Sequence, residues 1–123
     1  MPRPKFQTLT EQMFYVLLCL KEERYGMDIL DQVPAMTEGR VRVGSGTLYH
    51  LLEEFSQAGM IRETDTLGRK RTYILTREGR ERLEQEVERL RAQVEDYRRY
   101  YVEGLEWTSS TDWKDTVPMT APG

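Results

Sequence analysis

The most apolar stretch of the chain runs from Met13 to Leu20 and predicts a helix that is buried on most of its sides. Two start signals precede it. Thr8 and Glu11 have the spacing of a capping box, and Thr10 is a rival N-cap. The charged residues 21–24 follow the stretch. We therefore expect the central core helix to begin between Thr8 and Thr10 and to end near Leu20.

A second amphipathic stretch predicts a helix that begins near Tyr25. Ile29, Val33 and Met36 have the spacing of one inner face. Pro34 interrupts this pattern, because a proline inside a helix removes a hydrogen bond and clashes with the preceding turn. We expect a kink or an early end near Val33.

The third stretch has the clearest helical pattern. One apolar stripe contains Leu48, Leu51, Leu52, Phe55 and Ala58. The opposite side contains Gly46, His50, Glu53 and Gln57, with Thr47 and Tyr49 on the flanks. Gly59 suits the left-handed position that stops a helix. The pattern predicts a helix with one buried and one exposed face.

Residues 60–63 and 71–75 then predict two strands of a hairpin, with the tip at Gly68. Beyond the hairpin, Thr76 is the expected N-cap of a long helix that continues to about Glu103. Its apolar seam alternates spacings of four and three residues and comprises Leu83, Val87, Leu90, Val94, Tyr97 and Tyr101. This heptad pattern predicts a coiled-coil dimerisation helix.

These elements define a mainly α fold with a small antiparallel β-hairpin. We expect a basic N-terminal arm at 1–8, a winged helix-turn-helix domain at 9–75, a C-terminal dimerisation helix at 76–103 and a flexible tail at 104–123. In this plan the apolar stripe of the third helix anchors it to the first two. Its other side and its N-terminus are then free to enter the major groove of DNA.

Charge refines this picture. The 123 residues carry a net charge of −3, so no global field favours nucleic acid. Residues 1–10 and 62–72 nevertheless each have an excess of two positive charges. The residues expected to contact DNA are Lys5, Arg40, Arg42, Ser45, Gly46, Thr47, Tyr49, His50, Arg69, Lys70 and Arg71.

Several of these residues also have a plainer interpretation. The hydroxyl of Tyr49 suits a phosphate contact, but its ring could simply cover the core. His50 could touch a base edge or only be solvated, and residues 69–71 could be an ordinary hairpin tip. Glu53 and Glu54 repel phosphate, so we expect only the first turns of the third helix to enter the groove.

Taken together, residues 9–101 resemble the PadR family of transcriptional regulators. The resemblance rests on Leu9-Thr10, Tyr25-Gly26, Gly46-Thr47-Leu48-Tyr49, Gly68-Arg69-Lys70-Arg71-Thr72-Tyr73 and Thr76-Arg77-Glu78-Gly79. It implies a bacterial repressor that dimerises through its C-terminal helix and binds a palindromic operator. Two departures concern the recognition helix: Gly44-Ser45 replaces the Ser-Pro of many members, and Pro34 lies within the second helix.

The single long final helix is similar to the short-form branch, which includes multidrug-responsive regulators of the LmrR type. In that branch a groove between protomers can hold flat hydrophobic compounds. The resemblance thereby suggests a ligand site with Tyr97, Tyr100, Tyr101 and Trp107. Dimer packing is the alternative role for the tyrosines, and a place in the tail is the alternative for Trp107.

The leading hypothesis is a homodimeric operator-binding repressor that a small hydrophobic ligand releases. The alternative is a winged-helix and coiled-coil module that binds another protein and has no specific DNA binding. No catalytic pairing or phosphate-cradling loop is apparent, so we predict no enzyme activity and no cofactor. With one His and one Cys, no metal site is expected.

Two further observations concern the cellular compartment of the protein. The single cysteine, Cys19, suits a reducing cytosol and is expected to be a small core residue. No apolar run approaches the roughly 18 residues that a membrane span requires. We therefore expect a cytoplasmic protein without a membrane partner.

Overall fold

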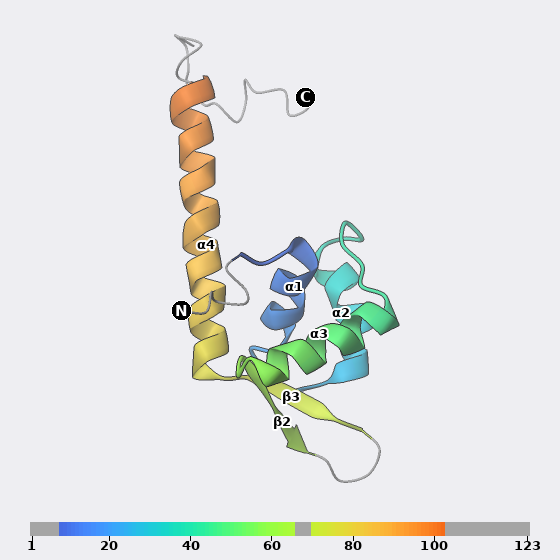
Figure 1. The fold of residues 1–123 in the computed structure, drawn as a ribbon. Coiled ribbons are helices and arrows are strands. Elements are labelled where there is room, and N and C mark those ends of the chain that lie inside the picture. The colour runs from blue at the N-terminus through green and yellow to red at the C-terminus, as the bar shows by residue number, and fades with distance from the viewer. Residues whose placement is uncertain (1–7, 66–69, 103–123) are drawn as a thin grey trace. The chain divides into compact units, whose positions relative to one another are not determined.

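The computed structural model describes residues 8–65 and 70–102 and confirms a mainly helical fold with a small antiparallel sheet (Figure 1). Contacts divide the chain into two compact units, Met1–Glu86 and Val87–Gly123. The elements are α1 (Glu11–Cys19), β1 (Arg24–Tyr25), η1 (Gly26–Asp28), α2 (Ile29–Met36), α3 (Ser45–Gln57), β2 (Ile61–Asp65), β3 (Thr72–Leu75), α4 (Arg77–Tyr97) and η2 (Arg98–Val102).

The core of the first unit is formed by the apolar faces of α1, α2 and α3. Its fully buried side chains include Val16, Leu17, Leu20, Ile29, Val33, Leu48, Leu52 and Phe55. Thr10 is the N-cap of α1, and its Oγ1 accepts a hydrogen bond from the Met13 N–H at 3.1 Å. Of the two expected start sites, the structure therefore selects Thr10.

The second helix starts later than the sequence predicts. Tyr25 belongs to strand β1, and a short 3-10 turn, η1, separates it from α2. Of the kink or early end expected near Val33, the early end is wrong, since α2 continues to Met36 with Pro34 inside it. Thr37 is the C-cap of α2: its buried Oγ1 donates to the Val33 carbonyl at 2.9 Å and accepts from the Val41 N–H at 3.1 Å.

The third helix follows the predicted pattern except at Ala58, which was expected in the apolar stripe but is the exposed C-cap of α3. Gly59 has a φ of +78° and donates its N–H to the carbonyl of Ser56. Met60 donates to the carbonyl of Phe55, so the two bonds close a Schellman motif at the end of α3. The glycine at position 59 is required because this backbone conformation strains other residues.

The wing is a three-stranded antiparallel sheet in the order β1-β3-β2. The hairpin strands β2 and β3 were predicted, with β2 shifted to Ile61–Asp65, but β1 was not. Tyr25 of β1 pairs with Thr72, and Ile61 of β2 pairs with Leu75. Glu23 supports the sheet from the preceding loop, because its carboxylate accepts from the hydroxyls of Thr64 at 2.7 Å and Thr72 at 3.2 Å. The predicted hairpin tip at 66–69 lies outside the described residues.

Helix α4 begins within the first unit. The Oγ1 of Thr76 accepts from the Gly79 N–H at 3.0 Å and donates to the Gly59 carbonyl at 2.6 Å. One helical turn further, Leu83 is buried in the core. Glu86 is buried as well, and its carboxylate accepts from the Leu9 N–H at 3.2 Å. The first turns of α4 thus belong to the same core as α1 and α3.

The second unit contains the remainder of α4 and the π-helical turn η2. Its apolar side chains are largely exposed: Leu90 is 39% exposed, Val94 52%, Tyr97 39% and Tyr101 55%. Tyr97 and Tyr101 stack, with ring centroids 5.3 Å apart and an interplanar angle of 29°.

Candidate nucleic-acid interface

One face of α3 is open to solvent, and its opposite face is buried. Its first half exposes Ser45, Gly46, Thr47, Tyr49 and His50, and the exposed face continues to the end of the helix with Glu53, Ser56 and Gln57. Leu48, Leu51, Leu52 and Phe55 lie in the core. A helix held in this way presents its polar face outward as a rigid element.

The loop before α3 alternates between buried and exposed residues. Val41 and Val43 are buried, whereas Arg40 and Arg42 are exposed. Gln12 of α1 fixes this loop by donating its side-chain N–H to the Arg42 carbonyl at 2.9 Å. Two guanidinium groups are therefore carried by a loop that leads directly into the exposed half of α3.

The N-terminus of α3 is sterically open. Gly44 is its N-cap and supplies no side-chain hydrogen bond to the first turn. A Cβ placed on Gly44 or Gly46 would have no other atom within 4 Å among its surroundings. The first N–H groups of the helix are therefore accessible to an anion such as a phosphate.

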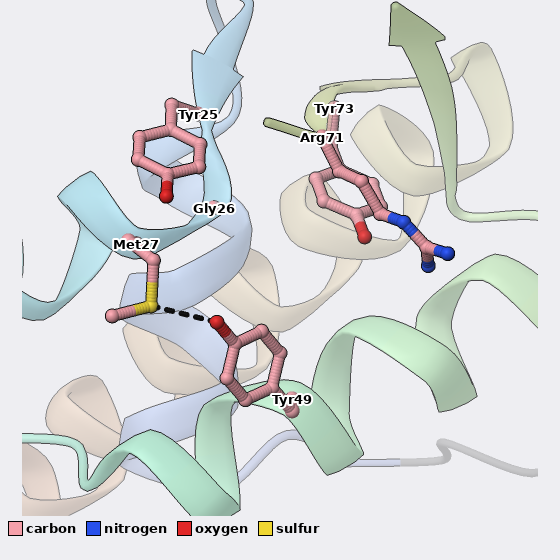
Figure 2. A pocket seen from close by; sticks show the side chains of 6 residues that line it. All are labelled: Tyr25, Gly26, Met27, Tyr49, Arg71 and Tyr73. Carbon is pink, nitrogen blue, oxygen red and sulfur yellow. Dashed lines mark hydrogen bonds between the residues drawn. The ribbon is translucent and has the colours of Figure 1, made fainter. Parts of the chain in front are cut away.

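Two polar contacts restrain the side chains on this face. The Tyr49 hydroxyl donates to the sulfur of Met27 at 2.8 Å (Figure 2). His50 Nε2 lies 3.3 Å from the carboxylate of Glu54, one turn along the helix. Both residues remain exposed, so neither contact buries them.

The wing contributes positive charge beside α3. Arg71 is exposed, and its Nε lies 3.4 Å from the carboxylate of Glu63. The Lys70 ammonium lies 4.9 Å from the centroid of the Tyr25 ring, a cation–π distance. Arg69 and Lys5, which were also expected to contact DNA, lie outside the described residues.

A pocket of about 230 Å³ lies between α3 and the sheet. Its lining consists of Tyr25, Gly26, Met27, Tyr49, Arg71 and Tyr73 (Figure 2). Tyr49 and Arg71 were predicted as interface residues, but Tyr25, Met27 and Tyr73 were not. The sequence did not predict strand β1, and it is the pairing of β1 with β3 that brings Tyr25 and Tyr73 together.

The predicted dimerisation residues fall into two groups. Leu83 is buried in the first unit and Val87 is half-buried, whereas Leu90, Val94, Tyr97 and Tyr101 are exposed in the second. Among the suggested ligand residues, Tyr100 is 76% exposed, with the Arg99 guanidinium 4.9 Å from its ring. Trp107 lies outside the described residues.

Cys19 is a core residue, as expected. It is only 2% exposed. Burial raises the pKa of its thiol from 9.0 to about 11, and the positive charge of Arg24 opposes part of that rise. A thiol in this environment is almost entirely protonated at neutral pH.

Three helices, the third with an exposed face, and a small antiparallel wing beside it define the winged helix-turn-helix class of DNA-binding proteins. The sequence profile of the transcriptional regulator PadR-like family matches residues 16–85, more than half of the chain. The chain belongs to this family. It is therefore a transcriptional regulator of a DNA-binding family, and not an enzyme.

Solved structures of transcriptional regulators share this fold. A transcriptional regulator from Clostridium thermocellum is 19% identical in sequence to this chain and superposes with a TM-score of 0.61. The match covers 74% of this chain and 92% of the other chain. RosR from H. salinarum is 26% identical with a TM-score of 0.55, and the match covers 79% of this chain and 89% of RosR. A PadR-like transcription factor from Bacteroides fragilis is 29% identical with a TM-score of 0.52, and the match covers 68% of this chain and 86% of that protein.

A search of curated proteins finds no match. Within residues 8–65 and 70–102, no helix has the length and apolar character to cross a membrane.

Proposed function

We propose that this protein is a homodimeric, sequence-specific repressor that binds a palindromic operator. The first half of α3 enters the major groove, and Lys70 and Arg71 of the wing contact the phosphate backbone. The observation that carries the proposal is the division of α3 into a buried apolar stripe and an exposed polar face that starts at the N-terminus of the helix.

Electrostatics limit how α3 approaches DNA. Glu53 is exposed on the third turn of α3, and Glu54 follows it. Carboxylates there repel phosphate, whereas Arg40 and Arg42 lie just before the helix. The N-terminal turns therefore enter the groove, and the later turns stay away from the backbone.

Dimerisation is proposed from the exposed stripe of the second unit. Leu90, Val94, Tyr97 and Tyr101 follow spacings of four, three and four residues on a helix that is otherwise rich in charge. A second copy that covers this stripe would bury it as a coiled-coil seam. Two protomers then present two recognition helices to half-sites about one helical turn of DNA apart, roughly 34 Å.

We also propose that a flat hydrophobic ligand at the dimer interface releases the repressor from DNA. The stacked rings of Tyr97 and Tyr101 supply an aromatic surface on the stripe itself. Tyr100 is available beside them. Trp107 is the fourth residue that we propose for the ligand site.

The test is a fluorescence-anisotropy titration against the DNA upstream of the protein's own gene, with a scrambled fragment as the control, at low and near-physiological salt. Preference for the native fragment at both salt concentrations, with one dimer per site, is the expected result. In vitro transcription from the same fragment should fall when the protein is added. Equal, salt-sensitive binding to both fragments would instead favour the protein-interaction module.

A further inference from the structure

We propose that the pocket formed by Tyr25, Tyr49, Tyr73, Met27, Gly26 and Arg71 is an oxyanion site that holds a phosphate group of the DNA backbone. We call it the tyrosine pocket. The inference rests on the proposed function and deepens it, because it adds Tyr25 and Tyr73 to the surface that contacts DNA. Neither residue was expected there from the sequence.

The first argument is the state of the three phenol hydroxyls. They come from β1, α3 and β3, and Figure 2 shows them facing the space between the helix and the sheet. The Tyr49 hydroxyl donates to a thioether sulfur, which is a weak acceptor. Within the described part of the chain, Tyr25 and Tyr73 have no hydrogen bond from their hydroxyls. Three donors therefore lie in one pocket without an oxygen or nitrogen acceptor.

The second argument is positive charge at the pocket. Arg71 lines it, and its partner Glu63 forms an exposed ion pair of the kind that contributes little to stability. A phosphate can replace that carboxylate at small cost. The Lys70 ammonium, over the Tyr25 ring, has no ion pair in the described segments and adds a second cation.

The surroundings also contain acidic groups. Glu53 and Glu63 line an adjoining pocket that shares Tyr49, Arg71 and Tyr73 with this one. These carboxylates repel an anion on that side. They favour the tyrosine pocket over its neighbour as the place where a phosphate binds.

The third argument is size and position. A volume of about 230 Å³ is several times the ~30 Å³ share of one water molecule in the liquid. A phosphate together with the nearest atoms of its sugars therefore fits. Tyr49 is 53% exposed and belongs to α3, while Arg71 belongs to the wing. A DNA strand that passes between these two elements places a phosphate at this point.

The test uses the double variant Tyr25→Phe/Tyr73→Phe in the full-length protein. Among residues 8–65 and 70–102 the two hydroxyls have no hydrogen-bond partner to lose, so the fold should be retained. The phenyl ring at position 25 still lies under Lys70. We expect about a tenfold weaker affinity for the native DNA fragment. The dependence of log K on log salt should not change, because neutral hydroxyls release no counterions.

Tyr15→Phe is the matched control, because Tyr15 lies on α1 and lines neither pocket. It should bind DNA like the wild type. A second titration follows tyrosine ring resonances by NMR with inorganic phosphate, for the wild type and the double variant. This arm does not depend on operator recognition, so it tests the pocket even if the proposed function fails.

The outcomes separate the two sources of phosphate. Weaker DNA binding by the double variant at an unchanged salt slope supports the DNA backbone as the occupant. Unchanged DNA binding, with loss of the phosphate response, supports an oxyanion site for a free phosphate-bearing molecule and rejects the DNA assignment. No difference between the double variant and the wild type in either titration would overturn the proposal.

Discussion

Gly79 of α4 packs directly against the carbonyl group of Met60, at the junction between α3 and β2. A Cβ at position 79 would overlap the Met60 oxygen and lie 2.9 Å from Cδ2 of Leu75. The obstacle at Met60 is backbone, which cannot rotate away as a side chain does. Helix α4 can therefore start at this place only because residue 79 has no side chain.

Replacing Gly79 by Ala should destabilise the protein by about 1–3 kcal/mol, as overpacking of a well-packed core does. Urea unfolding, monitored by circular dichroism, measures the free energy of unfolding. Gly46→Ala is the matched control, because its Cβ would meet open space and alanine favours a helix. Equal stability of the Gly79→Ala variant and the wild type would contradict this packing.

Removing the positive charges of Lys70 and Arg71 from the wing should weaken DNA binding at every sequence. For Lys70→Ala/Arg71→Ala, we expect the slope of log K against log salt to become shallower by about 1.8, if each residue neutralises one phosphate. The measurement is anisotropy at several salt concentrations. Arg80→Ala/Arg91→Ala removes the same charge from exposed positions of α4 and should leave the slope unchanged. An unaltered slope in the wing variant would exclude the wing from the interface.

Placing a charge in the exposed seam should separate the protomers. Leu90→Asp puts a carboxylate into the proposed dimer contact, so we expect a monomer in sedimentation velocity at micromolar concentration. Operator affinity should fall with it, since a monomer has one recognition helix. Ala92→Asp adds the same charge on an exposed residue outside the seam and should remain dimeric. A dimeric Leu90→Asp variant would mean that the seam is misplaced.

The thiol of Cys19 should react slowly while the protein is folded. With its pKa raised from 9.0 to about 11, the thiolate fraction at pH 8 is roughly 100-fold lower than in the unfolded chain. Iodoacetamide labelling in buffer and in concentrated urea, followed by mass spectrometry, measures the ratio. Similar rates in both solutions would show that Cys19 is accessible.

The raised pKa of the Cys19 thiol also makes the stability of the protein depend on pH. Between pH 9 and about 11 the unfolded chain loses the thiol proton while the folded chain retains it. The contribution of Cys19 to the free energy of unfolding therefore decreases as the pH rises through that window. Comparing the pH dependence of unfolding for the wild type and Cys19→Ala isolates this contribution.

Local patterns in the sequence determined most of the helices. The stripe of α3 and the left-handed glycine at position 59 depend on residues within one or two turns of each other. The same is true of the caps at Thr10 and Thr76. Such features are readable because helical periodicity and capping are short-range effects.

Contacts between distant segments decided the rest. Pairing of the two-residue strand β1 with β3 is a long-range event that no local pattern reports, and it shifts the start of α2 to Ile29. Burial of Leu83 depends on where α4 packs, although its heptad position matches that of Leu90. The tyrosine pocket likewise exists only because β1, α3 and β3 converge, since hydroxyls far apart in the chain can share one ligand only after the chain has folded.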